Sequence, residues 1–98
     1  MKFSTKNTNR ENISTLIRKI GYHYLDKTEK QEFNLVRLLE RGGYPRFHIY
    51  LKITPEELFF SLHLDQKKPV YKDAPAHSAD YKGKVVEQEA ERIKQLLK

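Results

Sequence analysis

The sequence predicts a single two-layer α+β domain with the element order α-β-β-β-α, in which a three-stranded antiparallel meander carries two helices on one face. Two observations predict this fold: amphipathic helical patterns lie near both ends of the chain, and segments of alternating apolar residues lie between them. At 98 residues the chain has room for one hydrophobic core. We therefore expect residues 1–98 to form one domain, with residues 1–8 as an N-terminal tail.

The first helix is predicted over residues 9–20. Thr8 and Glu11 have the spacing of a capping box, and Gly21 suits the left-handed position that follows a last helical turn. The apolar face, with the spacing i, i+3, i+4 and i+7, consists of Ile13, Leu16, Ile17 and Ile20. Behind this helix, residues 22–25 are expected to be extended and residues 26–31 to form a charged connector.

The first strand of the meander is predicted over residues 33–41. Phe33, Leu35 and Leu39 alternate as they would in a strand, whereas a helix that ends at Gly42 is the alternative. A helix would place Glu32 and Glu40 in its apolar arc, so the strand is favoured. Residues 33–40 are apolar on both faces, and an edge strand of this kind would invite self-association, which makes a protein-interaction or homodimerisation domain one alternative function.

The other two strands, residues 46–53 and 58–65, form the clearest hairpin. A turn at residues 54–57, with Pro55 at its second position, pairs residues whose numbers sum to 111. This register turns all apolar residues of both strands to one side, and a slip by one residue would expose one of the two sets. The opposite side then carries the pairs Arg46 with Asp65, His48 with His63, Tyr50 with Ser61 and Lys52 with Phe59.

Residues 66–80 contain two prolines and few core residues, so they are predicted to form an irregular arm. A second helix is predicted over residues 83–97. Its apolar positions are Val86, Ala90, Ile93 and Leu97.

The composition narrows the class of activity. The absence of cysteine excludes disulfides, thiolate zinc sites and cysteine nucleophiles. There is no apolar run of membrane-spanning length and no signal peptide, so we expect a cytoplasmic protein without a membrane partner. The chain contains no phosphate-binding glycine loop and none of the common hydrolase motifs, which makes an enzyme the less favoured class.

The net charge is +6, and the basic surplus lies in residues 1–31, with +4, and in residues 67–84, with +3. Basic residues from the arm, together with the aromatic and basic sheet face, predict a small non-enzymatic domain that binds nucleic acid. The predicted contact residues are Arg46, His48, Tyr50, Lys52, Lys67, Lys68, Lys72, Lys82 and Lys84. A solvated surface is the alternative interpretation of these charges.

The facing pair His48 and His63 predicts a second kind of site. Two imidazoles on adjacent strands can bind one ion, with Asp65 or His77 as a third ligand in zinc-like geometry. The same residues could perform acid–base chemistry in a hydrolytic site. No cofactor is otherwise indicated, so Zn²⁺ is the one metal that the sequence suggests.

Two resemblances add to this interpretation. The segments PRFHIYLK, LHLDQKKPVY, AHSADY and VVEQEAERI resemble a family of small uncharacterised bacterial proteins over most of residues 33–95. That resemblance implies a compact cytoplasmic domain and places His63, Asp65, His77 and Tyr81 in one polar or metal-binding cluster. The α-β-β-β-α layout is also similar in topology to the double-stranded RNA-binding domain, although the arm is longer and the lysine cluster that opens that family's second helix is reduced.

Overall fold

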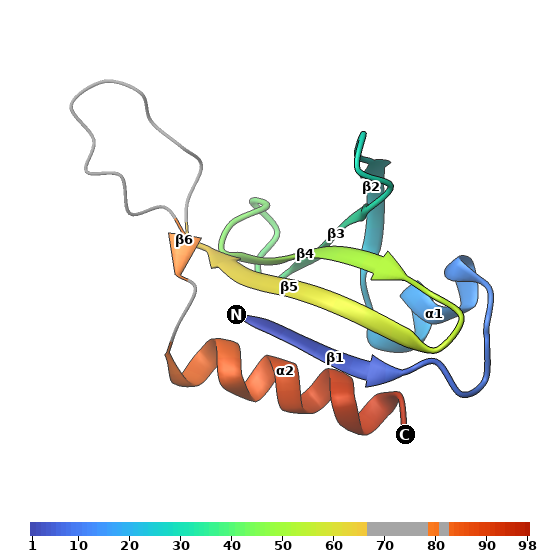
Figure 1. The fold of residues 1–98 in the computed structure, drawn as a ribbon. Coiled ribbons are helices and arrows are strands. Elements are labelled where there is room, and N and C mark those ends of the chain that lie inside the picture. The colour runs from blue at the N-terminus through green and yellow to red at the C-terminus, as the bar shows by residue number, and fades with distance from the viewer. Residues whose placement is uncertain (67–78, 81–82) are drawn as a thin grey trace.

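The computed structural model describes residues 1–66, 79–80 and 83–98, and it has an α+β fold in which one antiparallel sheet packs against two helices (Figure 1). The elements follow one another along the chain as β1 (Lys2–Lys6), α1 (Ile13–Ile20), β2 (His23–Lys27), β3 (Phe33–Leu38), β4 (Arg46–Ile53), β5 (Glu57–Asp65), β6 (Ala79–Asp80) and α2 (Lys84–Leu96). The strand order in the sheet is β1-β5-β4-β3-β2, and β6 also pairs with β5. The α+β class is confirmed, whereas the order α-β-β-β-α with three strands is wrong.

The predicted hairpin of β4 and β5 is confirmed residue by residue. Ile53 pairs with Leu58, His48 with His63, and the pairing continues to Arg46 and Asp65. The Thr54 amide donates to the Glu57 carbonyl at 2.9 Å and closes the turn. One side of this hairpin is therefore apolar along its whole length, and this side forms the core of the protein.

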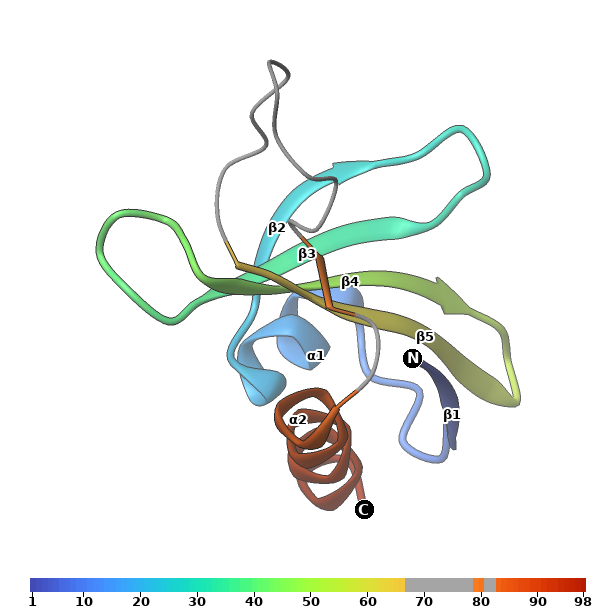
Figure 2. The same ribbon diagram turned by 90° about the vertical axis from the view of Figure 1, so that its left-hand side faces the viewer.

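Both helices lie on this apolar side of the sheet, as the sequence predicts (Figure 2). The buried residues of the helices and of the sheet form one cluster: Leu16, Ile17, Ile20, Tyr22, Leu35, Phe47, Ile49, Leu51, Leu58, Phe60, Leu62, Leu64, Val86, Ala90 and Ile93. The opposite side of the sheet, which points away from α1 and α2, is called the outer face below.

The first helix begins later than the sequence predicts. Asn12 is the N-cap, and its Oδ1 accepts a hydrogen bond from the Thr15 amide at 2.9 Å. Arg10 has a φ of 47°, which is incompatible with a helix that starts at residue 9, so the capping box is wrong. Gly21, with a φ of 82°, ends the helix in the left-handed conformation, as expected.

The expected N-terminal tail is instead strand β1, which lies antiparallel along the first half of β5. Phe3 is its one large apolar residue, and the ring stacks on Phe60 with 4.8 Å between the ring centroids. A strand of five residues with a single apolar side chain is too short to give a periodic pattern. The pairing is decided by the free edge of β5, whose backbone groups need partners.

Two further expectations about the sheet need correction. The strand β3 lies between β2 and β4, so it is an interior strand and the apolar segment 33–40 offers no free edge for self-association. In the predicted irregular arm, Ala79–Asp80 forms the short strand β6, which pairs with Leu64 and Asp65 of β5. The rest of the arm, residues 67–78, lies outside the described residues.

The helix α2 contains a buried ionisable side chain that was not predicted from the sequence. Glu89 is 4% exposed and accepts hydrogen bonds from Tyr22 at 2.6 Å, from Arg37 of β3 at 3.1 Å and from Arg92 at 2.8 Å. Arg92 also donates to the carbonyl of Ile20 at 2.6 Å. Burial, and the carboxylate of Glu89, raise the pKa of Tyr22, so the phenol stays protonated as the donor. These contacts connect α2 to the end of α1 and to the sheet.

Candidate functional site

The strand register places polar side chains from three strands together on the outer face. Arg46 and His48 project from β4, and His63 and Asp65 project from β5, because residues two apart along a strand share a face. From β3, Asn34 faces the same way, since it pairs with Tyr50 while Val36 pairs with His48. The site is therefore built on the central, fully paired strands of the sheet.

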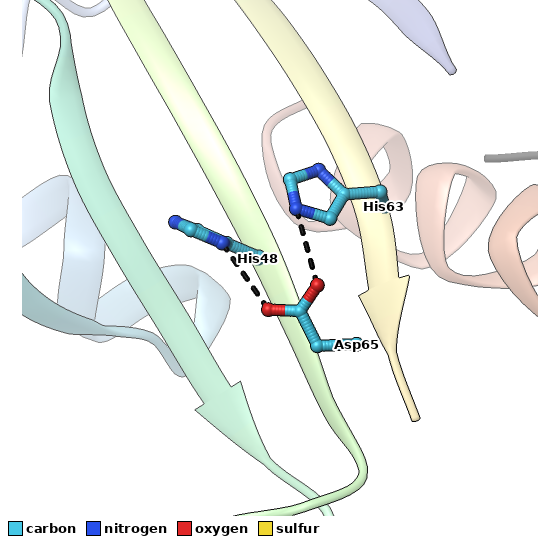
Figure 3. A group of neighbouring side chains, drawn as sticks. All are labelled: His48, His63 and Asp65. Carbon is cyan, nitrogen blue, oxygen red and sulfur yellow. Dashed lines mark ion pairs between the residues drawn. The ribbon is translucent and has the colours of Figure 1, made fainter. Parts of the chain in front are cut away.

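His48, His63 and Asp65 converge on each other at this place (Figure 3). Each imidazole faces a different oxygen of the same carboxylate: His48 Nδ1 lies 3.3 Å from Asp65 Oδ2, and His63 Nε2 lies 3.3 Å from Asp65 Oδ1. The ring centroids of the two histidines are 4.7 Å apart. One potential ligand atom from each of the three residues lies within 4.8 Å of the other two.

The second nitrogen of His48 is held by β3. His48 Nε2 contacts the side-chain amide of Asn34, and this contact holds the orientation of the imidazole while Nδ1 faces Asp65. Asn34 was not predicted as a site residue, because the loop between β3 and β4, although it contains Gly42 and Gly43, does not by itself fix the register of the two strands.

Burial sets the electrostatics of the cluster. His48 is 8% exposed and His63 is 7% exposed. Burial disfavours the charged imidazolium and lowers the pKa of both histidines, while the carboxylate of Asp65 partly opposes this effect. Arg46 contributes a nearby positive charge, with its Nε 3.4 Å from Asp65 Oδ2.

The outer face continues into a groove beyond His48 and His63. Tyr50 and Lys52 of β4, Phe59 of β5 and Lys2 of β1 contribute to its walls, and its volume is about 320 Å³. Phe59 is 44% exposed. The predicted sheet residues therefore divide into a buried histidine cluster and an open aromatic groove.

The other predicted site residues fall into two groups. Lys84 is exposed in the first turn of α2, and this helix packs on the core side of the sheet, away from the outer face. The remaining predicted residues lie outside the described residues: Lys67, Lys68, Lys72, His77, Tyr81 and Lys82. For these six residues the site assignment stays a prediction.

Comparison with protein-family models, with curated proteins and with solved structures gives no match for this chain. Within the part of the chain that the structure describes, neither helix has the length and apolar character needed to cross a membrane. A function is therefore inferred below from the geometry of the outer face.

Proposed function

We propose that this protein binds a divalent transition-metal ion of the Zn²⁺ type through His48, His63 and Asp65. The observation that carries the proposal is the convergence of three ligand atoms, one from each residue, within 4.8 Å of one another. Two imidazoles and a carboxylate are a ligand set that proteins use for zinc and for non-haem iron.

The distances support an ion of this size. Zinc–nitrogen and zinc–oxygen bonds of about 2.0 Å in a tetrahedron place neighbouring ligand atoms about 3.3 Å apart. Each imidazole nitrogen lies 3.3 Å from an oxygen of the Asp65 carboxylate, although not from the same one. One atom from each of the three residues lies within 4.8 Å of the other two, so binding of one ion requires side-chain rotations that bring these atoms closer together.

The contact between His48 and Asn34 supports the same proposal. Metal-binding histidines commonly donate a hydrogen bond from the nitrogen that does not bind the metal, which fixes the tautomer and the ring orientation. Here Nε2 contacts the side chain of Asn34, which leaves Nδ1, on the side of Asp65, as the nitrogen that would bind the ion.

Uptake of Zn²⁺ by the purified protein tests the proposal directly. After equilibrium dialysis against Zn²⁺, metal analysis should find one ion per chain in the wild type. Asp65→Asn and His63→Gln should abolish this uptake, since each change removes a ligand. Far-ultraviolet circular dichroism checks that both variants are folded.

The matched control is His23→Gln, because His23 is an exposed histidine on β2 that does not belong to the cluster. This variant should retain full uptake. Equal uptake by the wild type, Asp65→Asn and His63→Gln would overturn the proposal. His77→Gln then tests the sequence-based prediction of a further ligand, which should lower the affinity if the arm contributes one.

A further inference from the structure

Two neighbouring rows of the sheet present the same set of chemical groups in the groove of the outer face. One row consists of Tyr50 on β4, Ser61 on β5 and Lys2 on β1. The next row consists of Lys52 on β4, Phe59 on β5 and Ser4 on β1. Each row therefore contains one aromatic ring, one amine and one serine hydroxyl group.

All six of these side chains line the groove of about 320 Å³, and no helix within the described residues lies over it. Both lysines and Phe59 are exposed. Two residues along a strand span about 6.8 Å, so the second row repeats the first at that distance. Each row thus offers one aromatic ring and one positive charge to a ligand that extends along the strands.

A ring, an amine and a hydroxyl match the parts of a nucleotide. Exposed aromatic rings stack on bases, and lysine amines neutralise phosphates. Stacking of this kind requires bases whose flat faces are free, which a single strand offers and a duplex does not. Glu32 also lines the groove and opposes an anionic ligand, so the two lysines leave only a small net positive charge there.

We infer that the groove binds single-stranded nucleic acid, with two consecutive bases at Tyr50 and Phe59 and the adjoining phosphates at Lys2 and Lys52. None of the four residues is a proposed ligand of the metal ion, although the two sites are neighbours, since the ring centroids of Tyr50 and His48 lie 4.8 Å apart. The sequence predicts a broad basic surface as the nucleic-acid contact, whereas this inference places the contact in two rows of the outer face.

Fluorescence anisotropy tests the inference with labelled ten-nucleotide oligo(U), oligo(dT) and a ten-base-pair duplex, in a buffer that contains EDTA. The wild type should bind a single strand more tightly than the duplex. Two phosphate contacts should give a slope of about −1.4, or a steeper one, in a plot of the logarithm of the association constant against the logarithm of the salt concentration. The RNA and DNA strands distinguish the two sources of a single strand, and binding of either one supports the inference.

The variants separate stacking from charge. Phe59→Ala should weaken binding by roughly tenfold or more and leave the salt slope unchanged. Lys52→Gln should reduce the slope by about 0.7, whereas Glu32→Gln should tighten binding. The matched control is Arg18→Gln, an equal loss of charge on exposed α1 behind the sheet, which should bind as the wild type does.

Three results would each overturn the inference: no binding of either single strand at about 50 mM salt, tighter binding of the duplex, or wild-type affinity in Phe59→Ala. A loss of affinity in Arg18→Gln as large as that in Lys52→Gln would also overturn it, because the interaction would then depend on net charge. Circular dichroism of each variant confirms that the protein is folded during these measurements.

Discussion

The two sides of the sheet each bury ionisable side chains, but they surround them differently. On the helix-covered side, Glu89 receives hydrogen bonds from Tyr22, Arg37 and Arg92, so both carboxylate oxygens are satisfied. On the outer face, two imidazoles converge on the single carboxylate of Asp65. The first arrangement is electrostatically complete, whereas the second brings three metal-ligating groups together.

This difference distinguishes a structural charge from a candidate binding site. The guanidinium groups of Arg37 and Arg92 neutralise Glu89. Arg92 also donates a hydrogen bond to the Ile20 carbonyl, which connects α2 to the end of α1. A buried charge with this many partners stabilises one packing of the elements. The cluster of His48, His63 and Asp65 lies on two adjacent strands that are already paired through their backbones.

The largest expected effect is on stability, through Glu89→Ala. This change removes the shared acceptor of two guanidinium groups and the Tyr22 hydroxyl, while Arg92 keeps its bond to the Ile20 carbonyl. It should lower the free energy of unfolding by about 3 kcal/mol. That value is at the lower end for a buried pair, because the side chains of Arg37 and Arg92 are each 33% exposed. Urea unfolding followed by circular dichroism measures the change.

A second glutamate on α2 provides the control. Glu91 is 66% exposed and lies 3.5 Å from Lys94, so Glu91→Ala should change the unfolding free energy by less than about 0.5 kcal/mol. Equal destabilisation by both variants would contradict the comparison. Glu89→Ala should also retain Zn²⁺ uptake in the fraction of protein that is folded, since the network and the cluster lie on opposite sides of the sheet.

A smaller effect is expected in the pH dependence of stability. Burial lowers the pKa of His48 and His63 in the folded protein below the ordinary value of about 6.5. Just below pH 6.5 the unfolded chain therefore binds more protons than the folded protein, and stability falls as the pH falls. The negative charge of Asp65 raises the pKa of His48, whereas the positive charge of Arg46 lowers it.

Urea unfolding of metal-free protein at pH 7.5, 6.5 and 5.5 measures this dependence. His63→Gln should lose less stability between pH 7.5 and 5.5 than the wild type, because one of the two buried histidines is gone. His23→Gln replaces an exposed histidine and should lose as much as the wild type does. The same loss in all three proteins would contradict a role for the buried imidazoles.

The smallest effect is expected for Arg46→Gln. The guanidinium lies 3.4 Å from Asp65 Oδ2 and competes with a bound cation for the negative charge of the carboxylate. Its removal should tighten Zn²⁺ binding several-fold, measured by competition with a chromophoric chelator. Arg18→Gln, with the same change of charge on α1, should leave the affinity unchanged. Weaker binding by Arg46→Gln would contradict this electrostatic explanation.

The sequence was most informative where a short turn connects two alternating segments. Pro55 and its neighbours fix the register of β4 and β5, and this register predicts the pairs of His48 with His63 and of Arg46 with Asp65. Most of the outer-face cluster therefore follows from the sequence alone. The convergence of both imidazoles on the carboxylate of Asp65 does not, because side-chain rotamers and burial depend on the surrounding packing.

Glu89 was not predicted to be buried, although the sequence contains a signal for it. It lies three residues after Val86 and four before Ile93, within the apolar arc of α2. Such a position indicates a buried carboxylate, but the partners Tyr22 and Arg37 are 67 and 52 residues away along the chain. No local pattern connects residues at such separations.

The sequence by itself determined the α+β class, the two amphipathic helices and the β4–β5 register, because helical and strand periodicities and turn chemistry are local properties. The tertiary structure decided that residues 2–6 join the sheet, that β3 is an interior strand, and that Asn34 orients His48. These features depend on contacts between segments that are far apart in the sequence. Such contacts form only when the sheet and the helices have packed, so no local periodicity in the sequence predicts them.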